Sequence, residues 1–252
     1  METHIITSIR NETVKIIYHF EKMKHLNQYI NIRKSKSTIK ATDNTIHQIV
    51  FDEITKFGTT LDLNHIDTSE VTKMYNWGTS GWCGSPFYNR VINKDAIISH
   101  EINVDVSKWN VSKCEDFGWM FYECYNFNCD LSEWDVSMAK TLAQMFSFCK
   151  KFNSDLSSWN TSHVSKMTGM FNQCLSFEFE TITNWDVSNV IDVAWIFANN
   201  EDTLEKQDVD LSKLWFSSIH SPNHDAFSNT KLEQDKRPFI GRKTSHTFER
   251  LN

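Results

Sequence analysis

The chain has 252 residues, and its hydrophobic (40%) and charged (23%) contents fit a soluble protein with a sizeable core, whereas its aromatic content (13%) is high. The net charge is −6, but residues 1–40 carry +5 and residues 231–250 carry +3, so the rest of the chain carries −14. This acidic middle argues against a nucleic-acid groove along it, because phosphates would be repelled. No run of about 18 apolar residues is present to span a membrane.

The N-terminal region predicts two amphipathic helices. Residues 11–30 and residues 45–57 both carry apolar side chains at helical spacing, and Gly58 stands where a glycine commonly ends a helix. The first unit of a stacked array needs its open face covered. We therefore expect residues 1–58 to form an N-terminal helical cap.

One phrase of sequence occurs four times between Asp105 and Phe197. Its tryptophans are 25, 25 and 26 residues apart, and its phenylalanines repeat these spacings. A fixed period of this size is typical of a solenoid, in which each unit buries its apolar face only against its neighbours. The landmarks are Trp109, Trp134, Trp159, Trp185, Phe121, Phe146, Phe171 and Phe197.

Two partial copies flank these four. Residues 61–74 form a further copy with Ile66 in the tryptophan position, and residues 210–215 keep only the beginning of the phrase. Asp62 and the equivalent Asp105 are 43 residues apart, 18 more than one period of 25. One copy therefore carries an insertion, at about residues 76–100.

Within a copy, two periodicities assign the parts. Side chains alternate between apolar and polar from Phe127 to Leu131, which predicts a strand, and apolar residues at helical spacing from Val164 to Cys174 predict a helix. Four serines stand just before the predicted helices as N-cap candidates: Ser112, Ser137, Ser162 and Ser188.

This unit predicts an α/β repeat fold, a leucine-rich-repeat-like solenoid of short parallel strands and helices over residues 59–216. Residues 217–252 are polar, and we expect a partly irregular C-terminal cap or tail. Residues near Phe227 are expected to cover the open edge of the last copy.

The phrase W-D-V-S-x-V-x-x-M-x-x-M-F-x-x-C-x-x-F-N-x-D-L-S, which Asp130 to Ser157 nearly spells out, resembles the 25-residue repeat of the BspA-like leucine-rich-repeat surface proteins. The similarity extends over about Leu61 to Trp215. It implies a leucine-rich-repeat-like solenoid that binds other proteins and is mostly of unknown function. It brings no catalytic residue and no cofactor.

Two columns of recurring residues are candidate sites. Asp105, Asp130 and Asp155 would stack about 5 Å apart, as a site for a cation or a basic partner, or as solvated charges that cap backbone N–H groups. The recurring tryptophans could stack on a sugar or a peptide. Their phase with the core positions favours packing.

The six cysteines suggest structural roles. Cys124, Cys149 and Cys174 share one position of the phrase and are predicted to be buried thiols; a disulfide between one adjacent pair is the alternative. A zinc site is disfavoured because no C-x-x-C motif or pair of histidines stands near them.

The insertion holds the other candidate site. Its stretch GWCGSPF is similar to the C-G-S-C-W stretch of papain-like cysteine proteases, but Pro86 stands where that pattern has its nucleophile, and spacing nominates no histidine as a base for Cys83. Aromatic residues enriched in binding hot spots also gather here, unless they fold back on the cap helices. These are Trp77, Trp82, Phe87 and Tyr88.

The sequence therefore predicts a non-catalytic, monomeric interaction module without cofactor or metal. Its partner would be a protein, with a glycan as the alternative, bound through the insertion aromatics and the aspartate column. A cysteine-dependent hydrolase using Cys83 and a purely structural spacer are the competing hypotheses. The first residues, METHIITSIRNETVK, lack a secretory signal, which favours an intracellular location over the cell surface.

Overall fold

The computed structural model describes residues 38–74, 76–77, 83–89, 99–219, 225–240 and 249–250. By its contacts, the chain separates into residues 1–38 and 39–252, and the described part belongs almost entirely to the second unit. The helix predicted within residues 11–30 lies outside the described residues. In the described part of the chain, every helix is too short or too polar to cross a bilayer.

The second predicted helix is confirmed as α2, Ile46–Phe57. Ile46, Val50 and Ile54 form its buried stripe. Gly58 ends it with φ of 97°, a left-handed conformation that favours glycine, and donates its N–H to the carbonyl of Ile54 at 2.8 Å.

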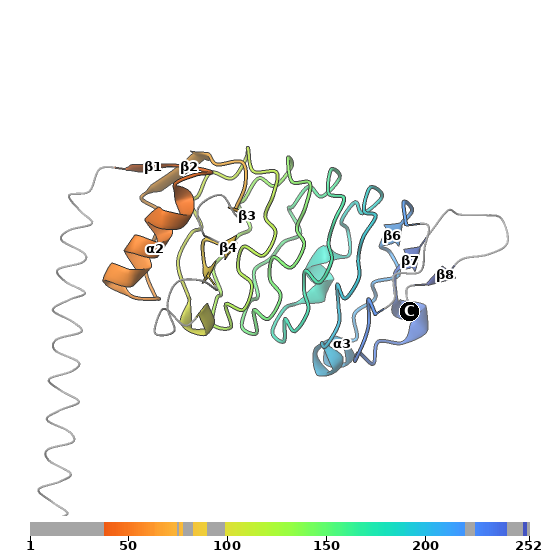
Figure 1. Ribbon diagram of the computed structural model, residues 1–252. Coiled ribbons are helices and arrows are strands. Elements are labelled where there is room, and N and C mark those ends of the chain that lie inside the picture. The colour runs from red at the N-terminus through yellow and green to blue at the C-terminus, as the bar shows by residue number, and fades with distance from the viewer. Residues whose placement is uncertain are drawn as a thin grey trace, which may run out of the picture. The chain divides into compact units, whose positions relative to one another are not determined.

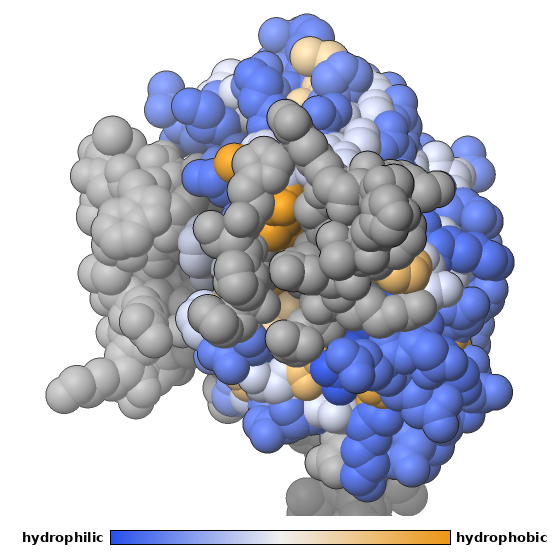
Figure 2. Space-filling model, turned by 90° about the vertical axis from the view of Figure 1, so that its right-hand side faces the viewer, coloured by the Kyte–Doolittle hydropathy of each residue, from blue (hydrophilic) through white to orange (hydrophobic). Residues whose placement is uncertain are grey.

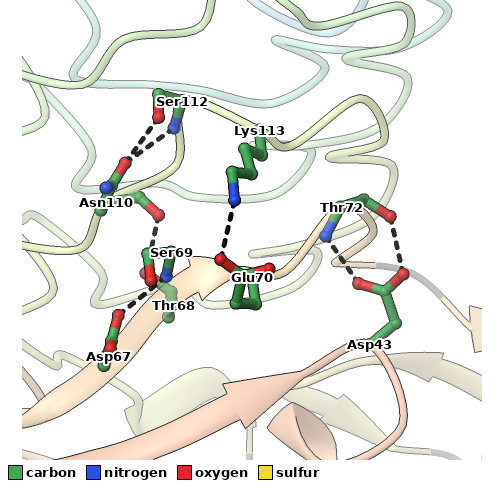
Figure 3. A network of polar contacts seen from close by, with 9 residues as sticks. All are labelled: Asp43, Asp67, Thr68, Ser69, Glu70, Thr72, Asn110, Ser112 and Lys113. Atoms are coloured by element: carbon green, nitrogen blue, oxygen red, sulfur yellow. Dashed lines mark hydrogen bonds and ion pairs between the residues drawn. The ribbon is translucent and has the colours of Figure 1, made fainter.

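Strand β1, Ile39–Thr42, pairs in parallel with β2, Ile66–Glu70, and so joins the segment before α2 to the first copy of the phrase. Asp43 strengthens this junction, because its carboxylate accepts the N–H of Thr72 and the hydroxyl of Thr72, both at 2.6 Å. The Thr68 hydroxyl then donates to the carbonyl of Asn110 in the next copy at 2.9 Å (Figure 3).

Equivalent positions of successive copies lie side by side. Figure 1 shows residues 99–219 as a succession of adjacent loops of the chain. Isolated parallel bridges link them, and the two that cross the insertion pair residues 43 positions apart, as the predicted insertion requires. The bridges are Asp62–Asp105, Lys73–Asp116, Asp116–Thr141, Thr141–Lys166 and Lys166–Asp192.

The prediction of a helix within each copy is wrong. Val164 to Cys174 form a series of turns, and Gly169 and Gln173 have positive φ. The N–H groups that a helix would use internally are donated to the next copy instead, as Gly169 N–H does to the carbonyl of Ala194 at 2.7 Å and Phe171 N–H to that of Ile196 at 3.0 Å. The same pairing joins the two preceding copies.

The predicted alternation from Phe127 to Leu131 is confirmed in burial, but these residues form no strand. Side chains replace the ladder of backbone hydrogen bonds. The amide oxygen of Asn128 accepts the N–H of Asn153 at 2.9 Å, and Asn153 accepts the N–H of Glu178 at 3.0 Å. The polar side chains of this segment therefore help to hold neighbouring copies together.

Two columns of phenylalanine rings fill the core. In the first, neighbouring ring centroids are 5.9–6.5 Å apart, in the second they are 5.7–5.8 Å apart, and every ring is fully buried. Phe227 stacks on the last ring of the first column at 5.1 Å, which confirms that this part of the C-terminal segment covers the final copy. The columns are Phe121, Phe146, Phe171 and Phe197, and Phe127, Phe152 and Phe177.

Short elements complete the described structure. Within the insertion, β3, β4 and β5 form an antiparallel sheet, and near the C-terminus β6 pairs in parallel with β7, which pairs antiparallel with β8. Their bounds, with those of α3 and the 3-10 helices, are β3 Asn76–Trp77, β4 Cys83–Ser85, β5 Tyr88–Asn89, η1 Ser99–Glu101, η2 Phe179–Ile182, α3 Glu201–Gln207, β6 Trp215–Phe216, η3 Gln234–Lys236, β7 Phe239–Ile240 and β8 Glu249–Arg250.

The segment predicted to be irregular beyond residue 217 thus contains two strands. The Phe239 N–H donates to the carbonyl of Leu214 at 3.1 Å, a long-range pairing that local sequence does not reveal. Figure 2, which views the right-hand end of Figure 1, shows hydrophobic atoms near the centre and mostly hydrophilic residues around them.

Candidate functional site

The predicted aspartate column forms turns. Asp105, Asp130 and Asp155 are exposed, and each accepts the backbone N–H of the serine two residues later, at 2.9–3.0 Å. These hydrogen bonds from the following serine lower the pKa of Asp130 and Asp155. The capping interpretation is therefore confirmed for the three carboxylates.

The serines predicted as helix N-caps occupy a second column of such turns. The Ser137 N–H donates to Asp135 at 3.0 Å, and the Ser188 N–H and hydroxyl donate to Asp186 at 3.0 and 2.7 Å. The prediction of N-caps is wrong because no helix follows them. Each serine instead donates to the acidic or amide side chain two residues before it.

Acid should destabilise the protein through these turns. Hydrogen bonds from Ser137 and Ser188 lower the pKa of Asp135 and Asp186, so the stability they contribute is fully present above the unfolded-state pKa, near 3.9, and is lost as the pH falls through the lowered values. We expect the free energy of unfolding, measured by urea titration, to fall steadily from pH 5 to about pH 3. Burial raises the pKa of Asp116, which acts in the opposite direction.

The variant Asp135→Asn removes the contribution of one carboxylate to the pH dependence of stability. It should make the pH dependence shallower, because asparagine does not titrate but can still accept the Ser137 N–H. Equal slopes for this variant and the unaltered protein would contradict the assignment.

The cysteine column is buried, as predicted. Cys124, Cys149 and Cys174 are free thiols, and burial raises the pKa of each. The thiols also donate to carbonyls, from Cys149 to Phe121 at 2.9 Å and from Cys174 to Phe146 at 3.0 Å. These properties fit structural cysteines rather than nucleophiles.

Asn200 takes the cysteine position in the fourth copy, 26 residues after Cys174. Its amide donates to the carbonyl of Phe171 in the preceding copy at 2.7 Å. The phase of the phrase contained this signal, but the change of residue type concealed it.

The tryptophans of the phrase are structural. Trp134 and its three counterparts are almost fully buried, and each indole N–H donates to a backbone carbonyl of the preceding copy at 2.9–3.1 Å. The packing interpretation is confirmed, and these rings are not presented to a sugar or a peptide.

The structure describes the candidate residues of the insertion to different extents. Phe87 is only 4% exposed, and its ring stacks on Phe121 at 5.1 Å and on Trp109 at 6.1 Å, so it belongs to the core and packs on the copies. The backbones of Trp77, Cys83 and Tyr88 lie in β3, β4 and β5. Their side chains, and all of Trp82, lie outside what the structure describes.

Sequence reasoning missed a different column of residues, which lies in the turns that replace the expected helices. Trp119 is 36% exposed and Trp195 is 46% exposed, and in the two copies between them the same position holds Gln144 and Gly169. All four have positive φ. We call these residues the turn column. Its spacing matches the phrase, but a tryptophan in two copies of four also fits the helix that the apolar spacing predicts.

The surface beside the turn column also differs from copy to copy. Glu115 forms an ion pair with Lys140 of the next copy at 2.7 Å, whereas the same position holds Ser165 and the exposed Ile191 in the later copies. Within the described ranges, no three His, Cys, Asp or Glu side chains lie close enough together to hold a metal ion.

Residues 91–210 match a family model described as Mycoplasma protein of unknown function, DUF285. The matched region contains all four copies of the phrase, so the period and the family model identify the same part of the chain. No curated protein and no solved structure gives a significant match. The family description assigns no activity, and function must be argued from the surface of the molecule.

Proposed function

We propose that the chain is a non-catalytic binding protein of the leucine-rich-repeat-like solenoid class, and that its partner is another protein. The observation that carries the proposal is a difference between the recurring positions, which are structural, and the exposed positions, which vary. Recurring residues such as Trp134, Phe146 and Cys149 are buried, and Asp130 is used in a turn. Exposed positions at the same phase differ in size and charge between copies.

The solenoid assignment rests on stacking of equivalent positions. Parallel bridges join Asp116, Thr141, Lys166 and Asp192 in succession, and backbone hydrogen bonds run from each of these copies to the next. Each copy thus buries its apolar face mainly against its neighbours, which is the principle of a solenoid.

The first full copy offers the surface best suited to a protein partner. Trp119 is exposed there, and Glu115, Asp116 and Glu123 lie within four residues of it in the chain, with Lys140 paired to Glu115. Exposed tryptophans are enriched in protein-binding hot spots, and polar or charged residues typically form the rim of such interfaces. The end of the insertion adjoins this copy, because the His100 ring stacks on Tyr125 at 3.9 Å.

Affinity capture from the native cells with the unaltered protein and with Trp119→Ala tests the proposal. A protein held only by the unaltered chain would then be purified and titrated calorimetrically, and we expect Trp119→Ala to weaken its binding about thirtyfold. Met138→Ala is the matched control, because Met138 is a large exposed apolar residue of the next copy. If Trp119→Ala captures every protein as well as Met138→Ala and the unaltered chain do, this surface does not bind the partner.

A further inference from the structure

A second surface, around Trp195, has a different chemical character. We define the amide surface as Gln144, Asn172, Gln173, Trp195 and Asn199. The turn segments that carry these residues, 142–149, 167–174 and 193–200, contain no Asp, Glu, Lys or Arg, whereas the equivalent segment of the first copy, 117–124, contains Glu123.

Glycine at position 169 shapes this surface. A Cβ atom at Gly169 would stand 2.2 Å from the side-chain nitrogen of Gln144, so the Gln144 amide lies over the glycine in the space that another side chain would fill. Gly169 also has φ of 59°. Because neighbouring copies are about 5 Å apart, the amide is brought next to the copy that carries Trp195.

Further amides are held in place beside it. The Asn199 amide donates to the side-chain oxygen of Asn172 at 2.9 Å, and Asn229 donates to Asn199 at 2.7 Å. Asn172, Gln173 and Asn199 are all half-buried. Such fixed amides present donors and acceptors at little further cost in side-chain entropy.

We infer that the amide surface binds a neutral saccharide, with the Trp195 indole stacked on the apolar face of a sugar ring and the amides of Gln144 and Asn172 bonding its hydroxyl groups. A sugar ring presents C–H groups on one face and hydroxyl groups around its edge, which matches an exposed indole surrounded by amides. The three segments contribute no Lys or Arg, and the neighbouring segment 225–230 contributes the acidic Asp225, which fits a ligand without negative charge. A phosphate or an acidic polysaccharide would require cations.

The charges closest in sequence support the choice. Lys166 and Asp192 stand three residues before Gly169 and Trp195, on neighbouring copies, and their backbones pair in a parallel bridge. Their opposite signs offset each other at this border, and the exposed Asp225, in the segment that pairs with Phe197 and Asn199, adds a negative charge, so an anionic partner is disfavoured. The amide surface differs from the proposed protein-binding surface, because its exposed aromatic residue is Trp195 rather than Trp119.

The site is open rather than enclosed, so we expect dissociation constants of millimolar order for short oligosaccharides and stronger retention by polymers, which can engage the surface repeatedly. The test is affinity electrophoresis of the full chain in gels containing laminarin, mannan, galactan or soluble starch, with heparin and alginate as charged probes. At least one neutral polysaccharide should retard the protein more than both charged probes do.

Substitutions test whether the retardation by a neutral polysaccharide comes from the amide surface. Trp195→Ala should lower the apparent affinity at least tenfold, and Gly169→Ala should lower it by displacing the Gln144 amide. Met138→Ala is the matched control, because Met138 is a large exposed apolar residue outside the three turn segments, and it should bind the polysaccharide like the unaltered chain. Trp195→Phe, which keeps an aromatic ring, should retain part of the binding and shows that position 195 can be altered without loss of folding.

Three outcomes would overturn the inference: no retardation by any neutral polysaccharide, equal or greater retardation by the charged probes, or equal affinity of Trp195→Ala and Met138→Ala. The protein-binding proposal fails separately, through an unchanged capture by Trp119→Ala. Trp119→Ala and Trp195→Ala therefore test the two proposals separately.

Discussion

Replacing Phe146 by alanine should lower the free energy of unfolding by about 3–5 kcal/mol. The Phe146 ring is fully buried in the middle of the first aromatic column, with Phe121 at 5.9 Å and Phe171 at 6.1 Å, and it meets Phe152 of the second column at 4.0 Å. Removing it leaves a cavity that both neighbouring copies border. Since each copy is stabilised mainly by its neighbours, the loss affects two interfaces at once.

Equilibrium unfolding in urea measures this effect, provided that the slope of the transition is unchanged. Met138→Ala is the control, because the Met138 side chain is largely exposed and its removal should change stability by less than about 0.5 kcal/mol. A loss below about 1 kcal/mol for Phe146→Ala would mean that the aromatic columns do not carry the core.

The variant Trp134→Phe should cost about 1–3 kcal/mol, because it removes an inter-copy hydrogen bond and leaves a smaller ring in a buried site. The indole N–H of Trp134 donates to the carbonyl of Val106 in the preceding copy at 3.1 Å, and phenylalanine has no such donor, so this carbonyl keeps only the N–H of Trp109 at 3.0 Å. Trp134→Ala should cost more, because it also removes the ring that packs near Phe117 and Phe121, at centroid distances of 6.1 and 6.3 Å.

Trp195→Phe provides the matched comparison for thermal and urea unfolding. Trp195 is the same residue type but lies at the surface, so this change should leave the free energy of unfolding within about 0.5 kcal/mol. If Trp134→Phe and Trp195→Phe have the same effect, the inter-copy hydrogen bond of the indole contributes nothing measurable to stability.

The period of the sequence was enough to predict which residues are equivalent and which of them are buried. Stacked copies place the same position side by side, so a large apolar residue can recur there only if each copy covers the next. This reasoning was correct for Phe146, Trp134, Cys149 and the cover at Phe227. It also predicted the insertion, because Asp62 and Asp105 pair although 43 residues separate them.

Tertiary structure decided the backbone of the segment from Val164 to Cys174 and, with it, the exposed surface. Apolar residues three and four apart fit a helix, but they fit a series of turns equally well, and the choice depends on where the N–H groups find acceptors. Those acceptors are carbonyls of the next copy, such as Ala194 for Gly169, and no local pattern contains them.

The same limit separates buried from exposed tryptophans and so separates scaffold from candidate site. Trp109 and Trp119 stand ten residues apart in one copy, yet the first reaches a carbonyl of the preceding copy and the second lies at the surface. By itself, the sequence determined the period, the core positions and the place of the insertion, because these follow from the stacking of identical units. Only the tertiary structure decided which side chains of the turns are exposed, because the conformation of the turns depends on hydrogen bonds between copies.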